Sequence, residues 1–268
     1  MDWISARDRL RSPLFAPLET AIARLPKDRW PAYEDLTAAA SGIVTAQGMP
    51  LRFVSPREHT DRERRYYELR IAETGEVETR VENWHDLFNA LAWITYPKAK
   101  AAINAQHAAM LREGGEAEAR RRSPERDALT LFDEGGVAVA STSPELMRLI
   151  VDFEWKQLFW SRRAELAAKM RFVGFGHAMY EQALEPYIGM VAKTVFVPVG
   201  ELFFMLPLES QVAQVDALLA AHFANRARFQ SPKMMAPMPV LGVPGWHPDT
   251  DREAYYDDPM HFRGPRPK

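Results

Sequence analysis

Hydrophobic positions recur at helical spacing in the segment ENWHDLFNALAWITYP, residues 82–97. At about 100° per residue, one side of this helix carries a wide apolar stripe, which is typical of a helix that faces a core. The stripe consists of Trp84, Leu87, Phe88, Leu91, Ile94 and Thr95. Pro97 then either kinks this helix or begins the next one, KAKAAINAQHAAMLRE.

Other segments also carry helix signals. The first 50 residues are interrupted by prolines and predict a layer of short helices. Ser143 followed by Pro144 is typical of a helix N-terminus, because serine caps free N–H groups and proline needs no N–H in the first turn. The predicted helices are APLETAIARL, EDLTAAASG, TSPELMRLI, GHAMYEQALEP and QVAQVDALLAAHFANRA.

Alternating and continuous apolar runs predict strands. RRYYELRIAETGEVETRV alternates around Thr74-Gly75 and predicts a β-hairpin, and RDALTLFD and VAVAS around Glu134-Gly135-Gly136 predict a second. The central strands are expected at RFVGF, KTVFVPV and ELFFMLP. Between the hairpins, the charged and glycine-opened residues 114–125 predict an exposed loop.

Hairpins interleaved with helices favour an α+β fold over a doubly wound parallel sheet, because strand and helix do not alternate regularly. A length of 268 residues fits one domain. We divide it into an N-terminal helical layer (1–50), an α+β body (51–230) and a proline-rich, irregular tail (231–268). The tail keeps aromatic residues and is expected to pack on the body.

Composition excludes several classes of protein. Hydrophobic residues make up 47% and charged residues 26%, as in an ordinary globular chain. Because 34 basic residues balance 36 acidic ones, a nucleic-acid partner is not expected, although arginines cluster in DRERRYYELR and RRRSPERD. The absence of cysteine excludes disulfides and thiolate sites and suits a cytoplasmic protein. We expect neither a signal peptide nor a membrane span.

The second face of the helix at residues 84–96 indicates a candidate site. It carries His85, Asp86, Asn89, Trp93 and Tyr96, without the lysines and arginines of a solvated face. Aromatic surface with a few convergent polar groups is typical of a pocket wall. The alternative is structural, because a carboxylate near a helix start favours the helix dipole and a buried histidine can bond a loop carbonyl.

Two neighbouring segments add candidates. Lys100, Asn104 and His107 lie along one stripe of the next predicted helix, where they either join the site or are simply solvated. Arg126 and Asp127 begin a predicted strand, and they either pair with each other or hold an anionic substrate. A small-molecule ligand is therefore the expected partner, and the sequence identifies no protein partner.

The segment FGHAMYEQ supplies a third group. His177 and Glu181 are four residues apart on a predicted helix, where they can form an acid–base pair, hold a divalent metal or make an ordinary surface bond. Gly174 and Gly176 precede them and would let a ligand approach the backbone. No phosphate-loop or nucleophile-elbow motif is present.

Five ordered blocks carry a resemblance to a known family. They are NWHDLFNALAW, RDALTLFDEGG, GHAMYE, PVLGVPGW and YYDDPMHFRGPR. The chain resembles, over roughly residues 30–265, a bacterial family common in proteobacteria, domain of unknown function 3025. The resemblance implies a cytoplasmic bacterial protein with a single domain. It implies no activity, so no residue role is carried over.

These residues support one leading hypothesis, an enzyme-like pocket for hydrolysis or group transfer on a small polar substrate. His85 would be the general acid or base, Asp86 its orienting partner or a metal ligand, and Asn89 a hydrogen-bond donor to the substrate. His177 and Glu181 would form the second acid–base or metal group, with the C-terminal tail as a partial cover. A divalent metal is one cofactor option. The alternative is a non-catalytic module that binds a small ligand or a protein.

Overall fold

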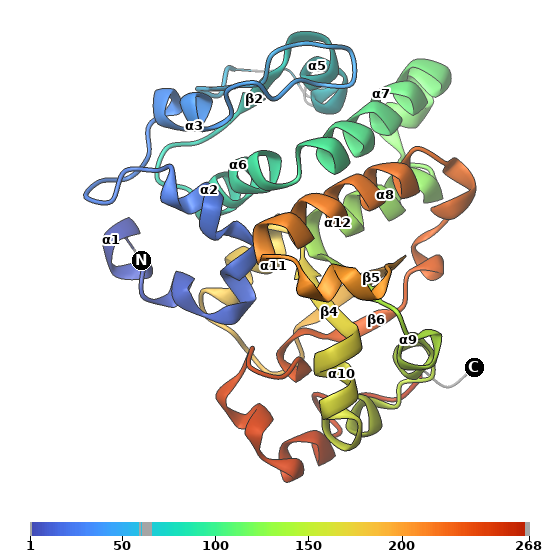
Figure 1. Cartoon of the computed structure of the whole chain (residues 1–268). Helices are drawn as coiled ribbons and strands as arrows, with labels where there is room; N and C mark the ends of the chain where they lie inside the picture. The colour runs from blue at the N-terminus through green and yellow to red at the C-terminus, as the bar shows by residue number, and fades with distance from the viewer. Residues whose placement is uncertain (1, 59, 61–65, 266–268) are drawn as a thin grey trace.

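A four-stranded mixed sheet forms the centre of the protein, in a computed structural model that describes residues 2–58, 60 and 66–265 (Figure 1). Its order is β4 (Met170–Gly174), β3 (Gly136–Ser141), β5 (Val191–Pro198) and β6 (Pro237–Pro239). Strand β3 is antiparallel to β4 and parallel to β5, and β6 is antiparallel to β5. Every residue of β3 is buried, which explains its continuous apolar run.

A second, two-stranded sheet pairs β1 (Arg52–Val54) in parallel with β2 (Glu76–Glu78). The hairpin predicted around Thr74-Gly75 is wrong, because the segment before the glycine is helix α5 (Tyr67–Thr74). Gly75 adopts a φ of 72° and donates its N–H to the Ile71 carbonyl, so it terminates the helix instead of turning a hairpin. Residues 61–65, where the predicted hairpin and the basic cluster begin, lie outside the described residues.

The strand predicted at RDALTLFD is also wrong, since this segment forms helix α8 (Pro124–Gly135). The Ser123 side chain caps the helix by accepting from the Arg126 N–H, and Pro124 occupies its first turn. Ala128, Leu129 and Phe132 then form its buried stripe. The adjoining VAVAS is a strand as predicted, within β3.

The remaining helices largely follow the apolar pattern. They are α6 (Trp84–Thr95), α7 (Pro97–Arg120), α9 (Pro144–Val151), α10 (Arg163–Lys169), α11 (His177–Ala183) and α12 (Leu208–Phe223). Pro97 begins α7. The loop predicted for residues 114–125 is wrong over most of its length, because α7 continues to Arg120 through a kink at Gly115 and α8 then begins.

Short helical turns make up much of the rest. The N-terminal layer contains α1 (Trp3–Ala6), α2 (Glu19–Ala23), α3 (Tyr33–Ala39) and the 3-10 turns η1 (Arg9–Arg11) and η2 (Pro13–Leu18). A π-helical turn, η3 (Gln157–Ser161), precedes α10. The strand predicted at ELFFMLP is wrong, since it forms the 3-10 turn η4 (Glu201–Met205), which leaves Leu202 and Met205 exposed.

The C-terminal tail is packed on the body, as its aromatic residues predict (Figure 1, red). Tyr256 is buried, and Trp246, Tyr255 and Phe262 pack against the core. Besides β6, the 3-10 turns from residue 226 onward are η5 (Arg226–Arg228), η6 (Pro232–Met234), η7 (Val240–Gly242), η8 (Pro248–Asp251) and η9 (Glu253–Asp257).

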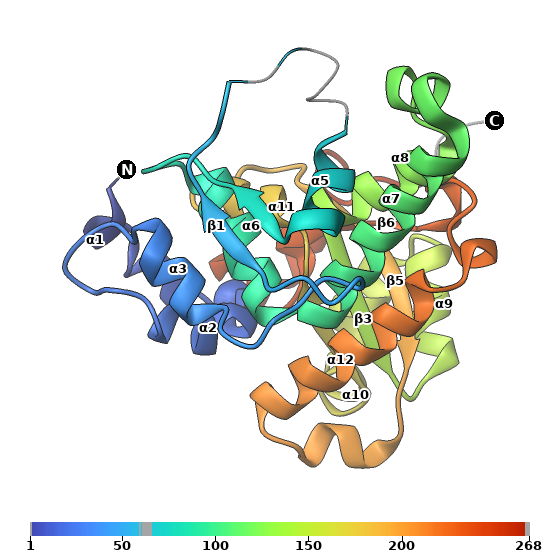
Figure 2. The same ribbon diagram turned by 90° about the horizontal axis from the view of Figure 1, so that it is seen from above.

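The α+β class predicted from the sequence is confirmed. Within the described residues, no helix combines the length and the apolar character needed to cross a membrane. Helix α7 packs against α5, α6 and α8, and α11 packs against α6 and α8 (Figures 1 and 2). This group of five helices surrounds the candidate site.

Candidate functional site

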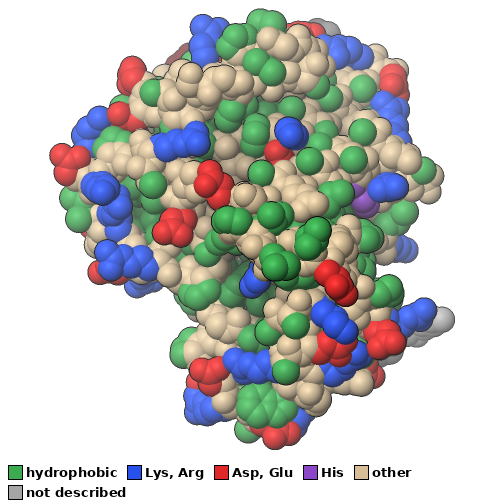
Figure 3. Space-filling view, viewed as in Figure 1, with side chains coloured by type: hydrophobic (Ala, Val, Ile, Leu, Met, Phe, Trp, Pro, Cys, Tyr) green, Lys and Arg blue, Asp and Glu red, His purple; other side chains and the backbone are tan. Residues whose placement is uncertain are grey.

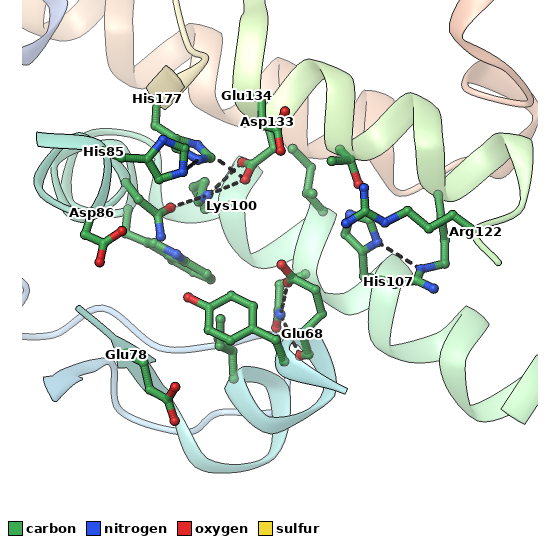
Figure 4. A pocket seen from close by; sticks show the side chains of 18 of the residues that line it. Glu68, Glu78, His85, Asp86, Lys100, His107, Arg122, Asp133, Glu134 and His177 are labelled. Atoms are coloured by element: carbon green, nitrogen blue, oxygen red, sulfur yellow. Dashed lines mark hydrogen bonds and ion pairs between the residues drawn. The ribbon is translucent and has the colours of Figure 1, made fainter. Parts of the chain in front are cut away.

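A cavity of about 710 Å³ lies among α5, α6, α7, α8 and the start of α11. Its volume is in the range of pockets that bind small molecules. Figure 4 shows its polar side chains in two groups, with His85 and His177 on one side and His107 and Arg122 on the other. We call these groups the histidine end and the arginine end.

Helix α6 supplies one wall of the cavity. Asn83 caps the helix by accepting from the Asp86 N–H, and the apolar stripe faces the core. Four of the five predicted site residues on its second face line the cavity: His85, Asp86, Asn89 and Trp93. The fifth, Tyr96, was wrongly placed in the site. It is fully buried, and its hydroxyl donates to the Gly174 carbonyl at 2.5 Å.

Asp86 was predicted to orient His85, but it does not. Its Oδ2 accepts from the Arg80 N–H at 2.7 Å and from Arg80 Nε at 2.8 Å. Burial raises the pKa of Asp86, but the hydrogen bonds and charge of Arg80 outweigh it and leave the pKa below its ordinary value. Asp86 is therefore an ionised partner of Arg80 in the cavity wall.

The histidine end contains a chain of titratable groups. Nε2 of His177 lies 3.2 Å from Nε2 of His85, and the rings meet edge to face. Nδ1 of His85 lies 3.0 Å from Oε2 of Glu181. Nδ1 of His177 lies 3.6 Å from Oδ2 of Asp133 and makes no hydrogen bond within the described residues. Glu181 therefore bonds His85, and not His177 as its spacing had suggested.

Lys100 lies at the end of this chain, next to Asp133. Its Nζ lies 2.6 and 2.8 Å from the two oxygens of Asp133, and 2.9 Å from Oδ1 of Asn89. The lysine is 4% exposed, and its ammonium lies over the Trp93 ring, 5.4 Å from the centroid. Burial raises the pKa of Asp133, but the charge of Lys100 outweighs it and lowers the pKa below its ordinary value.

His177 is neutral at neutral pH. Burial lowers its pKa from 6.5 to about 4. The negative charge of Asp133 opposes this pKa shift, whereas the charges of Lys100 and His85 add to it. A neutral imidazole carries a single N–H. Either the Nε2 or the Nδ1 of His177 therefore bears the proton, and the choice depends on the protonation of His85.

Glycines bring Asp133 and His177 together. The Gly176 N–H donates to the Gly136 carbonyl at 2.9 Å, and a Cβ on Gly176 would collide with the backbone of residues 134–136. A Cβ on Gly174 would meet the Tyr180 side chain. The predicted approach of a ligand to Gly174 and Gly176 is therefore wrong, because protein atoms occupy that space.

The arginine end is built around Arg126, which is 5% exposed. Its Nε donates to Nδ1 of His107 at 3.3 Å, and its Nη1 donates to the Glu118 carbonyl at 2.8 Å. Asp127 is exposed and does not line the cavity, so both of its predicted roles are wrong. Burial, together with the charge of Arg126, lowers the pKa of His107 to about 3. A neutral His107 that accepts at Nδ1 carries its proton on Nε2.

Glu68 and Asn104 lie between the two ends. The Asn104 side-chain amide donates to the backbone carbonyl of Glu68 at 2.8 Å and to Oε2 of the Glu68 side chain at 2.7 Å. The Oδ1 atom of Asn104 is buried without a partner in the described structure. Burial raises the pKa of Glu68, although the hydrogen bond from Asn104 opposes the rise. Glu68 therefore takes up a proton more readily than an ordinary glutamate.

A family model described as a protein of unknown function (DUF3025) matches residues 51–266. The match covers most of the chain. The chain belongs to this family. The helices that surround the cavity of this DUF3025 protein all lie within the matched residues. Comparisons with curated proteins and with solved structures give no match.

Several residues of the DUF3025 cavity were not predicted from the sequence. Thr130 and Asp133 line it four and seven residues after the predicted Arg126 on α8, and Tyr67 and Glu68 line it from α5. Asp133 had been placed at the end of a predicted strand, next to the predicted hairpin turn. The helical spacing along α8 was the signal that could have identified it. The tail does not act as a cover, since no residue from 231 to 265 lines the cavity.

Across the ranges that the structure describes, no three His, Asp or Glu side chains converge so as to hold a metal ion. His85 and His177 face each other, and each has a carboxylate at its far side. These four potential metal ligands therefore lie one after another and do not cluster around one point. This arrangement fits proton transfer better than metal binding.

Proposed function

We propose that the histidine end is an acid–base centre for hydrolysis or group transfer on a small polar substrate held in the cavity. The observation that carries the proposal is the 3.2 Å contact between the Nε2 atoms of His85 and His177. Glu181 lies at one end of this pair and Asp133 at the other. Histidine is the side chain most often used for proton transfer in enzymes.

The contact requires one proton between the two rings, because a hydrogen bond needs a donor and an acceptor. When His85 donates its Nδ1 proton to Glu181 and is neutral, its Nε2 accepts from the Nε2–H of His177. One further proton turns His85 into an imidazolium, which donates through Nε2 to a neutral His177. In that state the single proton of His177 lies on Nδ1, on the side of Asp133, so the pair holds one added proton without moving either ring.

The two histidine side chains differ in solvent exposure, and we assign their roles on that basis. The His85 side chain is 36% exposed and the His177 side chain 8%. We therefore assign His85 to proton exchange with the substrate, through its Nε2 when a substrate atom replaces His177 as the partner of that nitrogen, and His177 to the internal end of the pair. Glu181 fixes the orientation of His85. The Nδ2 group of Asn89 remains as a donor to the substrate, since its Oδ1 is taken by Lys100.

Replacement of His85 tests this proposal. His85→Gln should reduce kcat/KM by about a hundredfold or more on whichever small ester, amide or phosphate ester the protein turns over. The melting temperature should change by only a few degrees, because His85 lies at the edge of the core. His222→Gln is the matched control, since His222 is partly buried on α12 outside the cavity.

Retained turnover in His85→Gln would overturn the proposal. Absence of turnover by the unaltered protein on all three substrate classes, with a small molecule still bound in the cavity, would favour the alternative of a non-catalytic binding module. A nitrogen-15 NMR titration of the histidine rings adds a direct readout. It should show that the His177 ring stays neutral down to about pH 4.

We place this activity in the bacterial cytoplasm, supported by the absence of cysteine and the likeness of the sequence blocks to a bacterial family. We assign no nucleic-acid partner, because basic and acidic side chains are interspersed over the face shown in Figure 3. Cell fractionation tests the first statement. Retention on a polyanion column at low salt would contradict the second.

A further inference from the structure

We infer that the arginine end binds an oxyanion group of the ligand, a carboxylate or a phosphate. The inference deepens the proposed function, because it names the substrate class, and it rests on that function only in taking the cavity as the substrate site. The ligand would then be a small organic acid or a phosphate monoester. Its oxyanion would face Arg126 and its reactive polar group would face His85.

The polar groups without a partner at the arginine end are hydrogen-bond donors. Nη2 of Arg126 makes no hydrogen bond to a described residue, since its Nε and Nη1 hold the other bonds. His107 is a fixed donor at Nε2, because Arg126 occupies its Nδ1. Arg122 lines the same end and forms no ion pair with any residue that the structure describes. Three donors on one side of a cavity match the acceptor oxygens of an oxyanion.

Burial of the charged Arg126 side chain costs free energy that its described partners offset only in part. Its guanidinium is almost wholly buried, and its only described carboxylate partner is Glu118 at 3.5 Å, beyond a short ion pair. Burial lowers the pKa of Arg126, which means that its surroundings oppose the charge. A bound anion would compensate this charge on the Nη2 side. Buried cations are stable when they are paired and hydrogen-bonded.

At the histidine end, the described lysine and arginine side chains are already paired with carboxylates. Lys100 is paired with both oxygens of Asp133, and Arg80 is paired with Asp86. Glu68 is the carboxyl group that separates the two ends, and its raised pKa makes it ready to take a proton and become another donor. An anionic group therefore finds unpaired donors at the arginine end.

The test measures binding without turnover. Phenyl phosphate and benzoate serve as anionic probes and benzyl alcohol as the neutral probe, each followed by NMR titration of the Trp93 indole. At least one anionic probe should bind at least about tenfold more tightly than benzyl alcohol, and should weaken as salt is raised. Preference for phenyl phosphate or for benzoate tells a phosphate from a carboxylate.

Two neighbouring arginines provide a matched pair of variants. Arg122→Gln should weaken the bound probe by about tenfold, the usual value of one charge-assisted contact. Arg121→Gln should leave binding within about twofold, because Arg121 is exposed and outside the cavity. Arg126→Gln should weaken it at least as much as Arg122→Gln, with circular dichroism to confirm the fold.

Equal binding of the neutral and anionic probes, no binding of any probe, or equal effects of the Arg121 and Arg122 variants would overturn the inference. His85→Gln separates this inference from the proposed function, because it should abolish turnover and keep anion binding. Turnover that survives in His85→Gln, with anion binding intact, would remove only the acid–base proposal. Turnover that depends on His85, without anion preference, would remove only the inference.

Discussion

Lys100 and Arg126 are both buried cations that line the same cavity, yet their surroundings differ. Lys100 meets a carboxylate through two short contacts and an amide through a third. Arg126 meets a neutral imidazole, a backbone carbonyl and a carboxylate at 3.5 Å, and one of its amino groups remains unused. The cation at one end of the cavity is paired within the protein. The cation at the other end keeps a donor group without a partner among the described residues.

This difference explains how one cavity can both hold a ligand and move a proton. The short contacts of Lys100 with Asp133 and Asn89, and of His85 with Glu181, hold this end in one geometry, so His85 and His177 remain in place for proton exchange. An incompletely paired cation gains most from the arrival of an anion. We therefore expect the histidine end to contribute to stability and chemistry, and the arginine end to contribute to affinity.

The largest expected effect comes from breaking the end whose cation is paired. Asp133→Ala leaves Lys100 buried without its carboxylate and should lower the free energy of unfolding by about 3–5 kcal/mol, as measured by urea denaturation. Glu118→Ala at the other end should cost only about 1–2 kcal/mol, since the Glu118 carbonyl still accepts from Arg126. Equal losses in the two variants would contradict the comparison. The double variant Lys100→Met/Asp133→Leu should recover much of the loss.

Acid should destabilise both ends through their histidines. The folded pKa is about 4 for His177 and about 3 for His107, against an ordinary 6.5, so the unfolded chain binds more protons between these values. Stability must therefore fall as pH falls from 6.5 toward 4, by roughly 3 kcal/mol for His177 at 1.36 kcal/mol per pH unit. The lowered pKa of Asp133 adds a loss of the same sign at still lower pH, below the ordinary pKa of an aspartate.

Denaturation at pH 6.5 and pH 4 measures this effect. His107→Gln should flatten the acid dependence by removing one of the two groups, and His177→Gln should flatten it by removing the other. His222 also has a folded pKa of about 4, so the comparison is made between variants and not from the slope of the unaltered protein alone. An unchanged slope in both variants would show that neither imidazole is held neutral in the fold.

Gly176→Ala should produce a smaller and more local effect. The added Cβ must displace the backbone of residues 134–136, at a cost of about 1–3 kcal/mol, and this moves Asp133 relative to His177. Turnover should fall while binding of the anionic probe stays within about twofold, because Arg126 and His107 do not contact this segment. Gly135→Ala is the control, since a Cβ there meets no atom.

The sequence separates the two faces of α6, because its apolar stripe leaves one side of the helix free for polar groups, and four residues of that side line the cavity. The prediction failed at α8, although the same Ser-Pro signal of a helix N-terminus had been interpreted correctly at α9. Ser123, Pro124 and Glu125 begin α8 in the same way as Ser143, Pro144 and Glu145 begin α9. The glycines at the ends of α5 and α8 were taken as hairpin turns, whereas Gly75 ends α5 in a left-handed conformation, Gly135 is the last residue of α8 and Gly136 begins β3.

These two errors account for the missed site residues. With α5 and α8 read as strands, Glu68 and Asp133 had no reason to face α6 and α7. As helices, they present Tyr67 and Glu68 from one side of the cavity and Arg126, Thr130 and Asp133 from the other. The pairing of His85 with both Glu181 and His177 could not be predicted, because it depends on how α11 packs against α6.

The smallest effect is expected at Asp127, the predicted site residue that the fold places outside. Asp127 and Asp133 are both carboxylates of α8, but only Asp133 lines the cavity. Asp127→Asn should cost at most about 1 kcal/mol, the value of an acidic side chain in the first turn of a helix. It should leave both turnover and anion binding unchanged. Binding that weakens as much as in Arg122→Gln would mean that charge near the start of α8, and not the direction in which each side chain points, governs the arginine end.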